Sequence, residues 1–191
     1  GDAGTATVVV IDSNTETQRH REEWKFAFVA DGAKGDALRL SHGESIKMDG
    51  FTMGIIGVGN VGRRVEAMAR ALGFNLLLCD PPRAEKEGPE GFCSLDELLA
   101  GSNAVTLHVP LNESTRGMAD TSFFDKMLPG TVFINASRGE VVVEEALKEA
   151  LPKLGAVIID TWNNEPAVDK ELIDMVDIAT PHIAGYSYKG K

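Results

Sequence analysis

Apolar residues recur along the chain as short runs separated by amphipathic stretches, and this pattern becomes regular from Met53 onward. Each run is four to six residues long, consists mostly of β-branched or aliphatic residues, and lacks the alternation of a half-buried strand. Such runs are typical of strands in the middle of a parallel sheet that helices cover on both faces. We therefore expect six strands, at residues 53–58, 75–79, 104–109, 131–136, 156–160 and 177–180.

Helical candidates lie between these runs. Residues 60–72 carry apolar side chains at helical spacing, which predicts a helix with one apolar face made of Val61, Val65, Met68, Ala69 and Leu72. Ser94 and Glu97 have the spacing of a capping box, which predicts the start of a short helix. Further helices are expected at 121–127, 144–151 and 169–175. The alternation predicts an α/β fold, a Rossmann-like doubly wound parallel sheet with right-handed crossovers.

The first fifty residues follow a different pattern. Two apolar runs, at 6–11 and 26–29, stand among polar residues, and the polar run 13–23 fits a solvated helix or a loop equally well. Residues 30–50 carry four glycines and many small polar groups, which predicts an irregular connection. A segment of this size and composition cannot enclose a core of its own. We expect a partial, irregular N-terminal segment beside one regular domain.

Composition narrows the function classes. The chain has 191 residues, 43% hydrophobic and 25% charged, as in an ordinary globular protein. Its net charge of −10 opposes binding to nucleic acid or to anionic membranes. It contains neither a membrane-length apolar run nor a secretory signal, and its two cysteines, Cys79 and Cys93, are too few for a disulfide framework or a four-ligand zinc site. We expect a cytoplasmic protein without a metal site and, because the chain begins with Gly1, a processed or shortened product.

A glycine-rich segment, Gly57–Gly62, directly follows the first expected strand and opens the first expected helix. In the pattern G-x-G-x-x-G, Gly57 permits a tight turn, Gly59 lets the backbone approach a pyrophosphate, and Gly62 allows close helix–strand packing. The helix N-terminus then offers unpaired amide groups and a partial positive charge to the diphosphate. In this strand–turn–helix context the motif predicts a dinucleotide site.

Asp80 ends the second expected strand and follows Gly62 by 18 residues, close to the spacing of the acid that binds the adenosine ribose. A carboxylate there favours NAD, because it would repel the 2′-phosphate of NADP. Asp80 could instead merely cap a strand, since Asp-Pro-Pro is a common turn, and nearby Arg83 could accommodate a 2′-phosphate. We nevertheless expect NAD, bound by Gly57, Gly59, Asn60, Val61, Gly62 and Asp80.

Three polar residues follow consecutive strands at the edge where ligands of open α/β sheets bind: Arg138, Glu165 and His182. Histidine titrates near neutral pH and suits proton transfer to or from a hydroxyl oxygen. A neighbouring carboxylate fixes the tautomer of an imidazole and favours its protonated form, and arginine binds a carboxylate through two parallel hydrogen bonds. Singly, these residues fit a surface ion pair, an exposed loop and a structural histidine. Together, above a dinucleotide turn, they predict hydride transfer between a 2-hydroxy acid and a nicotinamide.

These motifs, together with Asn135–Gly139, Asn164–Pro166 and Pro181–Gly185, resemble the signatures of the D-isomer-specific 2-hydroxyacid dehydrogenases over about residues 50–191. The resemblance implies NAD as cofactor, with Arg138 binding substrate, Glu165 as partner acid and His182 as proton donor. It also implies further NAD contacts from Val109, Asp160 and Gly185, substrate contacts from Thr7 and Tyr186, and a structural His108.

Two stretches, 77–84 and 176–186, resemble one branch of the family in particular. That branch converts 4-phospho-D-erythronate to 2-oxo-3-hydroxy-4-phosphobutanoate in pyridoxal-phosphate biosynthesis. The alternatives are another D-2-hydroxyacid dehydrogenase, of the phosphoglycerate or glyoxylate type, and a non-catalytic NAD-sensing module.

In this family the coenzyme domain is inserted into a substrate domain, and only residues 4–12 resemble the upstream part. We expect residues 1–50 to be a remnant or divergent end of the substrate domain and its linker, and residues 51–191 to be the NAD-binding domain that carries the catalytic residues. The resemblance further implies a homodimer in the full-length protein, and a chain that alone binds NAD but is weakly active or inactive. Val143 stands where the family usually has Asp, which is expected to weaken a helix N-cap.

Overall fold

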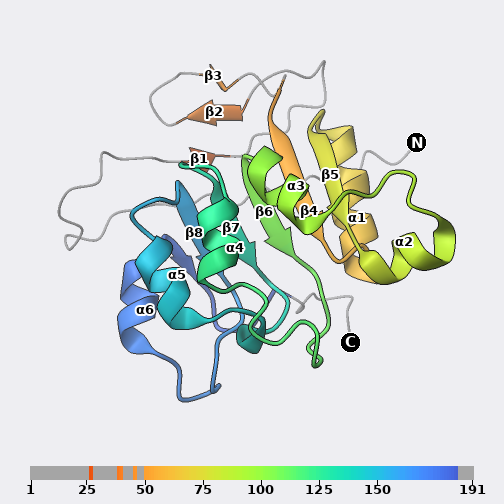
Figure 1. Cartoon of the computed structure of the whole chain (residues 1–191). Coiled ribbons are helices and arrows are strands. Elements are labelled where there is room, and N and C mark those ends of the chain that lie inside the picture. The colour runs from red at the N-terminus through yellow and green to blue at the C-terminus, as the bar shows by residue number, and fades with distance from the viewer. Residues whose placement is uncertain (1–25, 28–37, 41–44, 47–49, 185–191) are drawn as a thin grey trace, which may run out of the picture.

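A six-stranded parallel sheet forms the centre of the protein (Figure 1). The computed structural model describes residues 26–27, 38–40, 45–46 and 50–184, with side chains from residue 50 onward. The strand order is β5-β4-β6-β7-β8-β9, which confirms the predicted sheet. The strands are β4 (Thr52–Ile56), β5 (Asn75–Cys79), β6 (Ala104–Leu107), β7 (Val132–Asn135), β8 (Ala156–Ile159) and β9 (Ile178–Ala179).

The chain direction along the sheet reverses at β4, which pairs with β5 on one side and with β6 on the other. Because all six strands are parallel, their carboxyl ends share one edge, and the crevice beyond this edge at the reversal is the usual ligand site of such folds. The helices between the strands are α1 (Asn60–Ala71), α2 (Pro81–Glu87), α3 (Leu95–Gly101), α4 (Thr121–Lys126), α5 (Glu144–Ala150) and α6 (Lys170–Met175), with a 3₁₀ turn at Gly139–Val141.

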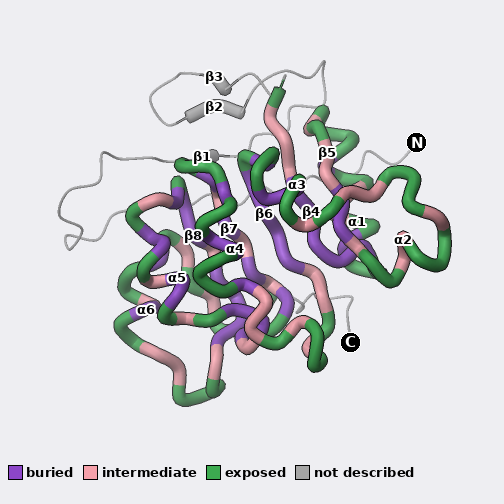
Figure 2. The backbone as a smooth tube through the Cα atoms, in the orientation of Figure 1, coloured by how far each residue is buried: buried purple, intermediate pink, exposed green. Residues whose placement is uncertain are grey.

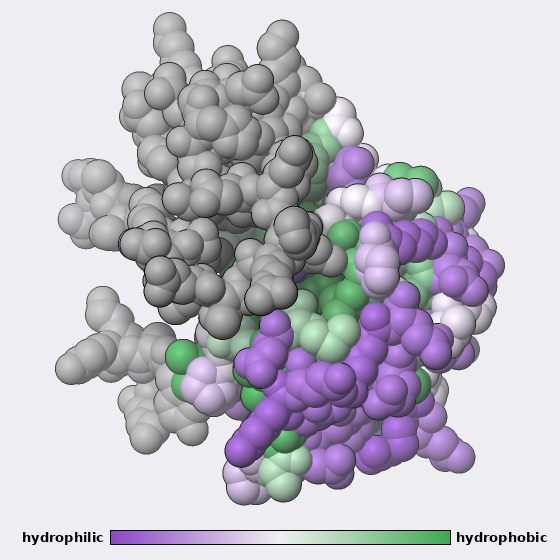
Figure 3. All heavy atoms as spheres, turned by 90° about the vertical axis from the view of Figure 1, so that its left-hand side faces the viewer, coloured by the Kyte–Doolittle hydropathy of each residue, from purple (hydrophilic) through white to green (hydrophobic). Residues whose placement is uncertain are grey.

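Neighbouring helices cover one face of the sheet, where α3 packs against α4, α4 against α5, and α5 against α6. The buried stretches follow the strands and the inner sides of these helices (Figure 2). Phe123 and Phe124 of α4 meet Phe133 of β7 edge to face, with ring centroids 6.2 and 5.1 Å apart. Each such pair adds about 0.5–1.5 kcal/mol to the effect of burial. The outer surface of α5 and α6 is mainly hydrophilic (Figure 3).

Helix α1 packs on the opposite face through different residues from those that its sequence suggests. The expected apolar face is wrong in part: Val61, Met68 and Leu72 are 60%, 64% and 45% exposed. The residues that α1 buries are Gly62 and Ala69. Val65, also on the expected face, is partly buried and packs against the core, so the prediction holds for Val65 and Ala69. Small side chains at Gly62 and Ala69 let the helix approach β4 and β5 closely.

The N-terminal segment contains three short strands, two of which lie within residues 30–50, where an irregular connection was expected. β1 (Phe26–Ala27), β2 (Leu38–Leu40) and β3 (Ser45–Ile46) form an antiparallel sheet in which Phe26 pairs with Leu40 and Leu38 with Ile46. β2 and β3 are only three and two residues long, too short for the alternation that identifies a strand in a sequence. The apolar run 6–11 and the polar run 13–23 lie outside the described residues.

Within the described ranges, the structure contains no helix long and apolar enough to cross a membrane.

Candidate functional site

The glycine turn between β4 and α1 shows which of its glycines the protein itself requires. Gly57 has φ +85°, and a Cβ there would lie 2.7 Å from the carbonyl carbon of His108. A Cβ on Gly62 would collide with the carbonyl oxygen of Gly57. A Cβ on Gly59, by contrast, would meet no atom of the residues that the structure describes within 4 Å. The backbone fold therefore needs the first and third glycines, whereas the second leaves open space beside the turn.

This open space lies at an uncapped helix N-terminus. Gly59 is the N-cap of α1, no side chain caps the helix, and its first turn contains no acidic residue. The first backbone amides of a helix have no intrahelical acceptor, and together with the helix dipole they attract anions. Asn60 and Val61, both exposed, stand in this first turn. The geometry is that of a phosphate-binding turn.

Asp80 fixes the turn from the end of β5. Its Oδ2 accepts a hydrogen bond of 2.7 Å from the Val58 amide, and its Oδ1 accepts one of 3.1 Å from the Arg83 amide. Asp80 thus caps helix α2 and holds the glycine turn against it. The sequence analysis offered a strand cap as the alternative role of Asp80, whereas the structure shows that Asp80 caps a helix. Proline directly after Asp is a signal of a helix start and could have indicated this.

The loop after β6 forms the other side of the crevice. The His108 amide donates to the Ile56 carbonyl over 2.7 Å, which places this loop beside the glycine turn. The His108 ring lies 3.0 Å from the Thr106 hydroxyl, and burial lowers its pKa. His108 is thus held by packing and by a local hydrogen bond, as expected. Val109, partly exposed at this edge, is predicted to contact NAD.

His182 and Glu165 form a direct pair at the same sheet edge. His182 Nδ1 lies 2.9 Å from Glu165 Oε2, and Glu165 Oε1 accepts a 2.8 Å hydrogen bond from the Trp162 amide. The side chains are 43% and 34% exposed, so a ligand can reach them. The opposite ring nitrogen, Nε2, has no hydrogen-bond partner in the part of the chain that the structure describes. The sequence-based expectation that these two residues converge agrees with this geometry.

Removal from water raises the pKa of Glu165, but the hydrogen bonds from the Trp162 amide and from His182 outweigh this effect. The pKa therefore lies below its ordinary value, and the carboxylate is ionised at neutral pH. An ionised partner fixes the imidazole with Nδ1 as the donor and leaves Nε2 as the nitrogen that exchanges a proton.

Asp160 shapes the turn that carries His182. Its buried carboxylate accepts hydrogen bonds from the Thr180 hydroxyl at 2.6 Å, from the Ile183 amide at 2.9 Å and from the Ala184 amide at 3.0 Å. Burial raises the pKa of Asp160, but these donors outweigh it and hold the pKa below its usual value. The sequence reasoning placed Asp160 at the cofactor and missed this positioning role. The cofactor contact stays a prediction.

The backbone of His182 is itself unusual. Its φ is +54°, in the left-handed region that few residues other than glycine adopt, and Asn164 before Glu165 has φ +56°. The bond from the His182 amide to the Asp160 carbonyl, 2.7 Å, holds this conformation. Non-glycine residues in this region cluster at ligand sites, because the surrounding structure must hold them there.

Arg138 follows β7 at the same edge. Its side chain is exposed, and its Nη1 donates a 2.6 Å hydrogen bond to the Ser137 carbonyl. Asn135 orders this turn: its Oδ1 accepts from the Ser137 amide and hydroxyl, and its Nδ2 donates to the Arg138 carbonyl. Among residues 50–184 no hydrogen bond joins Arg138 to Glu165 or His182, so the structure brings two of the three residues into contact.

Three predicted site residues, Thr7, Gly185 and Tyr186, lie outside the described residues. A mainly apolar hollow of about 370 Å³ lies beside the His182–Glu165 pair, lined by Trp162, Pro166, Val168, Ile173 and Thr180 among others. The described residues contain no cluster of three histidine, cysteine or acidic side chains placed to hold a metal ion.

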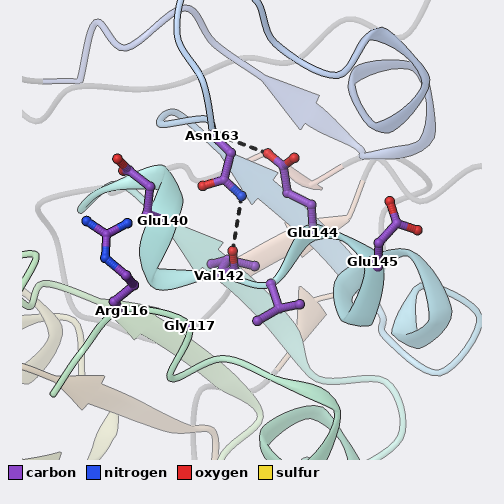
Figure 4. A pocket seen from close by; sticks show the side chains of 8 residues that line it. Arg116, Gly117, Glu140, Val142, Glu144, Glu145 and Asn163 are labelled. Atoms are coloured by element: carbon purple, nitrogen blue, oxygen red, sulfur yellow. Dashed lines mark hydrogen bonds between the residues drawn. The ribbon is translucent and has the colours of Figure 1, made fainter. Parts of the chain in front are cut away.

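A second hollow, of about 400 Å³, lies between the loop after β6 and the start of α5 (Figure 4). Asn163 lines this hollow. Its backbone amide donates a hydrogen bond of 3.1 Å to Glu144 Oε1, and its side-chain Nδ2 donates one of 3.3 Å to the Val142 carbonyl. These bonds tie the Glu165 loop to the N-terminus of α5, where Val143 is the N-cap and supplies no side-chain hydrogen bond. The weak cap expected from the sequence is therefore present.

Replacing Val143 with Ser should stabilise the protein by about 1 kcal/mol, because a hydroxyl at the N-cap accepts a hydrogen bond from the first turn. Val143 is 39% exposed, so little apolar contact is lost. The gain should appear as a higher urea midpoint and a rise in Tm of about 2–4 °C. Val142→Ser is the control: its side chain is buried, so the same change one residue earlier should destabilise. A Val143→Ser midpoint at or below wild type would contradict the prediction.

The comparisons with known proteins agree with one another. Residues 15–184 match the family described as D-isomer specific 2-hydroxyacid dehydrogenase, NAD binding domain. The erythronate-4-phosphate dehydrogenase of Chromohalobacter salexigens is 47% identical over 169 residues, which cover 85% of this chain and 44% of that protein. The chain therefore spans less than half the length of this relative.

Solved structures show the same likeness. A D-lactate dehydrogenase from Aquifex aeolicus, complexed with NAD and lactic acid, superimposes with a TM-score of 0.69 at 31% identity over 78% of this chain and 51% of that one. A glyoxylate reductase from Paecilomyes thermophila gives a TM-score of 0.66 at 35% identity over 77% and 47% of the two chains.

Proposed function

The chain belongs to the D-isomer-specific 2-hydroxyacid dehydrogenases, whose NAD-binding domain it contains, and from this premise we propose that it oxidises a 2-hydroxy acid with NAD. The observation that carries the proposal is the His182–Glu165 pair, 2.9 Å apart, at the same sheet edge as the open glycine turn. This pair supplies a proton acceptor where a dinucleotide-binding fold presents its ligand.

The residues present fit NAD. The open space beside Gly59 and the uncapped N-terminus of α1 suit a pyrophosphate. The carboxylate of Asp80, beside the same turn, is proposed to bind the adenosine ribose. Val109 and Asp160 remain proposed contacts for the other half of the molecule. When bound, NAD supplies the acceptor for the hydride that leaves the substrate carbon.

The side chains of this protein move and stabilise the proton. Nε2 of His182 accepts the proton of the substrate hydroxyl during oxidation and returns it during reduction. The carboxylate of Glu165, held by the Trp162 amide, stabilises the imidazolium that forms. Asp160 holds the His182 turn in place through its three donors, so the imidazole needs no reorganisation during the reaction.

Arg138 is proposed to bind the substrate carboxylate. Its exposed guanidinium keeps free donors beyond the bond to Ser137 and can form two parallel hydrogen bonds to a carboxylate. The 47% identity to an erythronate-4-phosphate dehydrogenase supports 4-phospho-D-erythronate as the substrate, with 2-oxo-3-hydroxy-4-phosphobutanoate as product, in pyridoxal-phosphate biosynthesis.

We further propose that the protein works in the cytoplasm as a homodimer. The two cysteines, which form no disulfide in the described residues, support a reducing compartment. The resemblance to the family supports the dimer.

The test is the appearance of NADH absorbance when the protein that contains this chain is given NAD and 4-phospho-D-erythronate. We expect turnover with this acid and weaker turnover with glycerate, 3-phosphoglycerate or lactate. Turnover confined to one of the other acids would reject the substrate but keep the reaction class. Tight NADH binding without turnover of any 2-hydroxy acid would favour a non-catalytic sensor instead.

A further inference from the structure

One acidic residue beside the glycine turn holds two arginines at once. Glu87 ends α2, and its carboxylate receives Arg83 in a two-point contact, with Nε to Oε1 at 3.1 Å and Nη2 to Oε2 at 2.6 Å. Arg63, from the first turns of α1, donates its Nη2 to the same Oε1 at 3.1 Å. A single carboxylate thus occupies guanidinium groups from two helices.

Arg83 is fixed in place by further contacts. Its Nη1 donates to the Val58 carbonyl over 2.9 Å, and its guanidinium lies over the Phe92 ring, 5.1 Å from the centroid. Its side chain is only 22% exposed, against 56% for Arg63. Arg83 therefore lies against the glycine turn, three residues after Asp80, with its Nε and Nη2 directed to Glu87.

The position of this cluster matters because Asp80 is the residue proposed to bind the ribose 2′-hydroxyl of the dinucleotide. In folds of this type an acid binds the 2′-hydroxyl of NAD, whereas a nearby arginine accommodates the 2′-phosphate of NADP. Here the acid, Asp80, and two arginines, Arg63 and Arg83, are present together. The carboxylates of Asp80 and Glu87 lie beside the guanidinium groups of Arg83 and Arg63 and offset their charges, which weakens the attraction of this site for a phosphate.

We propose that Glu87 is a specificity-determining residue for the cofactor: by occupying Arg83 and Arg63 it keeps the adenosine end selective for NAD over NADP. This inference rests on the proposed function and deepens it. To bind a 2′-phosphate, the site would have to break the two-point Arg83–Glu87 contact and accept the phosphate between two carboxylates. The 2′-hydroxyl of NAD requires neither change.

The test compares NADH and NADPH binding to the whole chain by titration of nucleotide fluorescence. Glu87→Gln keeps the size of the side chain and removes its charge, and Glu87→Ala removes all its acceptors. We expect both variants to bind NADPH about tenfold more tightly than wild type does, and to bind NADH within about threefold of it.

Two further variants isolate the cause. Glu85→Gln removes the same charge from the same helix, at an exposed residue for which the described structure gives no arginine contact, and should leave the NADPH-to-NADH ratio unchanged. Adding Arg83→Ala and Arg63→Ala to Glu87→Gln should abolish the gain in NADPH affinity, because both freed guanidinium groups are then absent.

An unchanged ratio in both Glu87 variants, with normal NADH binding, would overturn this inference and leave the proposed function standing. An equal gain in Glu85→Gln would also overturn it, because the effect would then be one of general charge. Failure of the wild-type chain to bind NADH would overturn the proposed function and this inference with it.

Discussion

Replacing His182 with Asn should lower the rate of 2-hydroxy acid oxidation by about 10²–10⁴-fold, the usual loss when a positioned acid–base group is removed. Asn is chosen because the φ of His182 is +54°, a conformation that Asn tolerates better than most residues. Its amide can still donate to Glu165, so the turn should persist. Because the loss is one of proton transfer, kcat and kcat/KM should fall together while NADH affinity stays within about twofold.

Glu165→Gln separates positioning from proton transfer. Gln can still accept the hydrogen bond from the Trp162 amide but offers no charge to the imidazolium. Activity should therefore fall less than in His182→Asn, and the pH profile of kcat/KM should shift.

Full activity of His182→Asn, with normal NADH binding, would contradict the role proposed for His182. If His182→Asn lowers both the NADH affinity and the Tm, the His182 turn would instead have a structural role.

The order of residues along the chain was enough to predict the sheet and the approach of Glu165 to His182. Parallel strands end at one edge, so residues just after consecutive strands are brought together whatever the details of their loops. The sequence did not show that the second carboxylate after β8, that of Asp160, supports the turn that carries His182. Asp160 and Glu165 are both acidic and both follow β8, yet the former binds Thr180 and two amides whereas the latter binds His182.

The features that the sequence did not reveal depend on packing. Helix α1 buries Gly62 and Ala69 and exposes Val61 and Met68, because close approach to the sheet favours small side chains over apolar ones. Helix α2 was missed because Asp80-Pro81-Pro82 was interpreted as a turn. The same residues are also an N-cap followed by proline in the first turn, a signal of helix initiation.

Changing the second glycine of the turn to alanine should abolish most cofactor binding without harming the fold. At Gly59 the new methyl group meets no atom of the described residues within 4 Å. The φ of −77° is accessible to alanine, whereas the ψ of −148° lies just outside the β region. Thermal stability should therefore stay close to that of wild type, because the gain from restricting the unfolded chain, about 0.4–1 kcal/mol, offsets the backbone cost at this ψ. The methyl group would occupy the space proposed for the pyrophosphate. If the cost resembles that of overpacking, about 1–3 kcal/mol, NADH affinity should fall roughly 10- to 100-fold.

Gly62→Ala is the matched control, because the same methyl group there collides with the Gly57 carbonyl inside the protein. It should lower the free energy of unfolding by about 1–3 kcal/mol as the turn and α1 separate. Thermal melts and NADH titrations of both variants distinguish the two effects: Gly59→Ala should lose binding with an intact melt, and Gly62→Ala should lose stability. If Gly59→Ala binds NADH as tightly as wild type does, the pyrophosphate lies elsewhere. The fold leaves this position open, so one added methyl group affects only a ligand that approaches this part of the backbone.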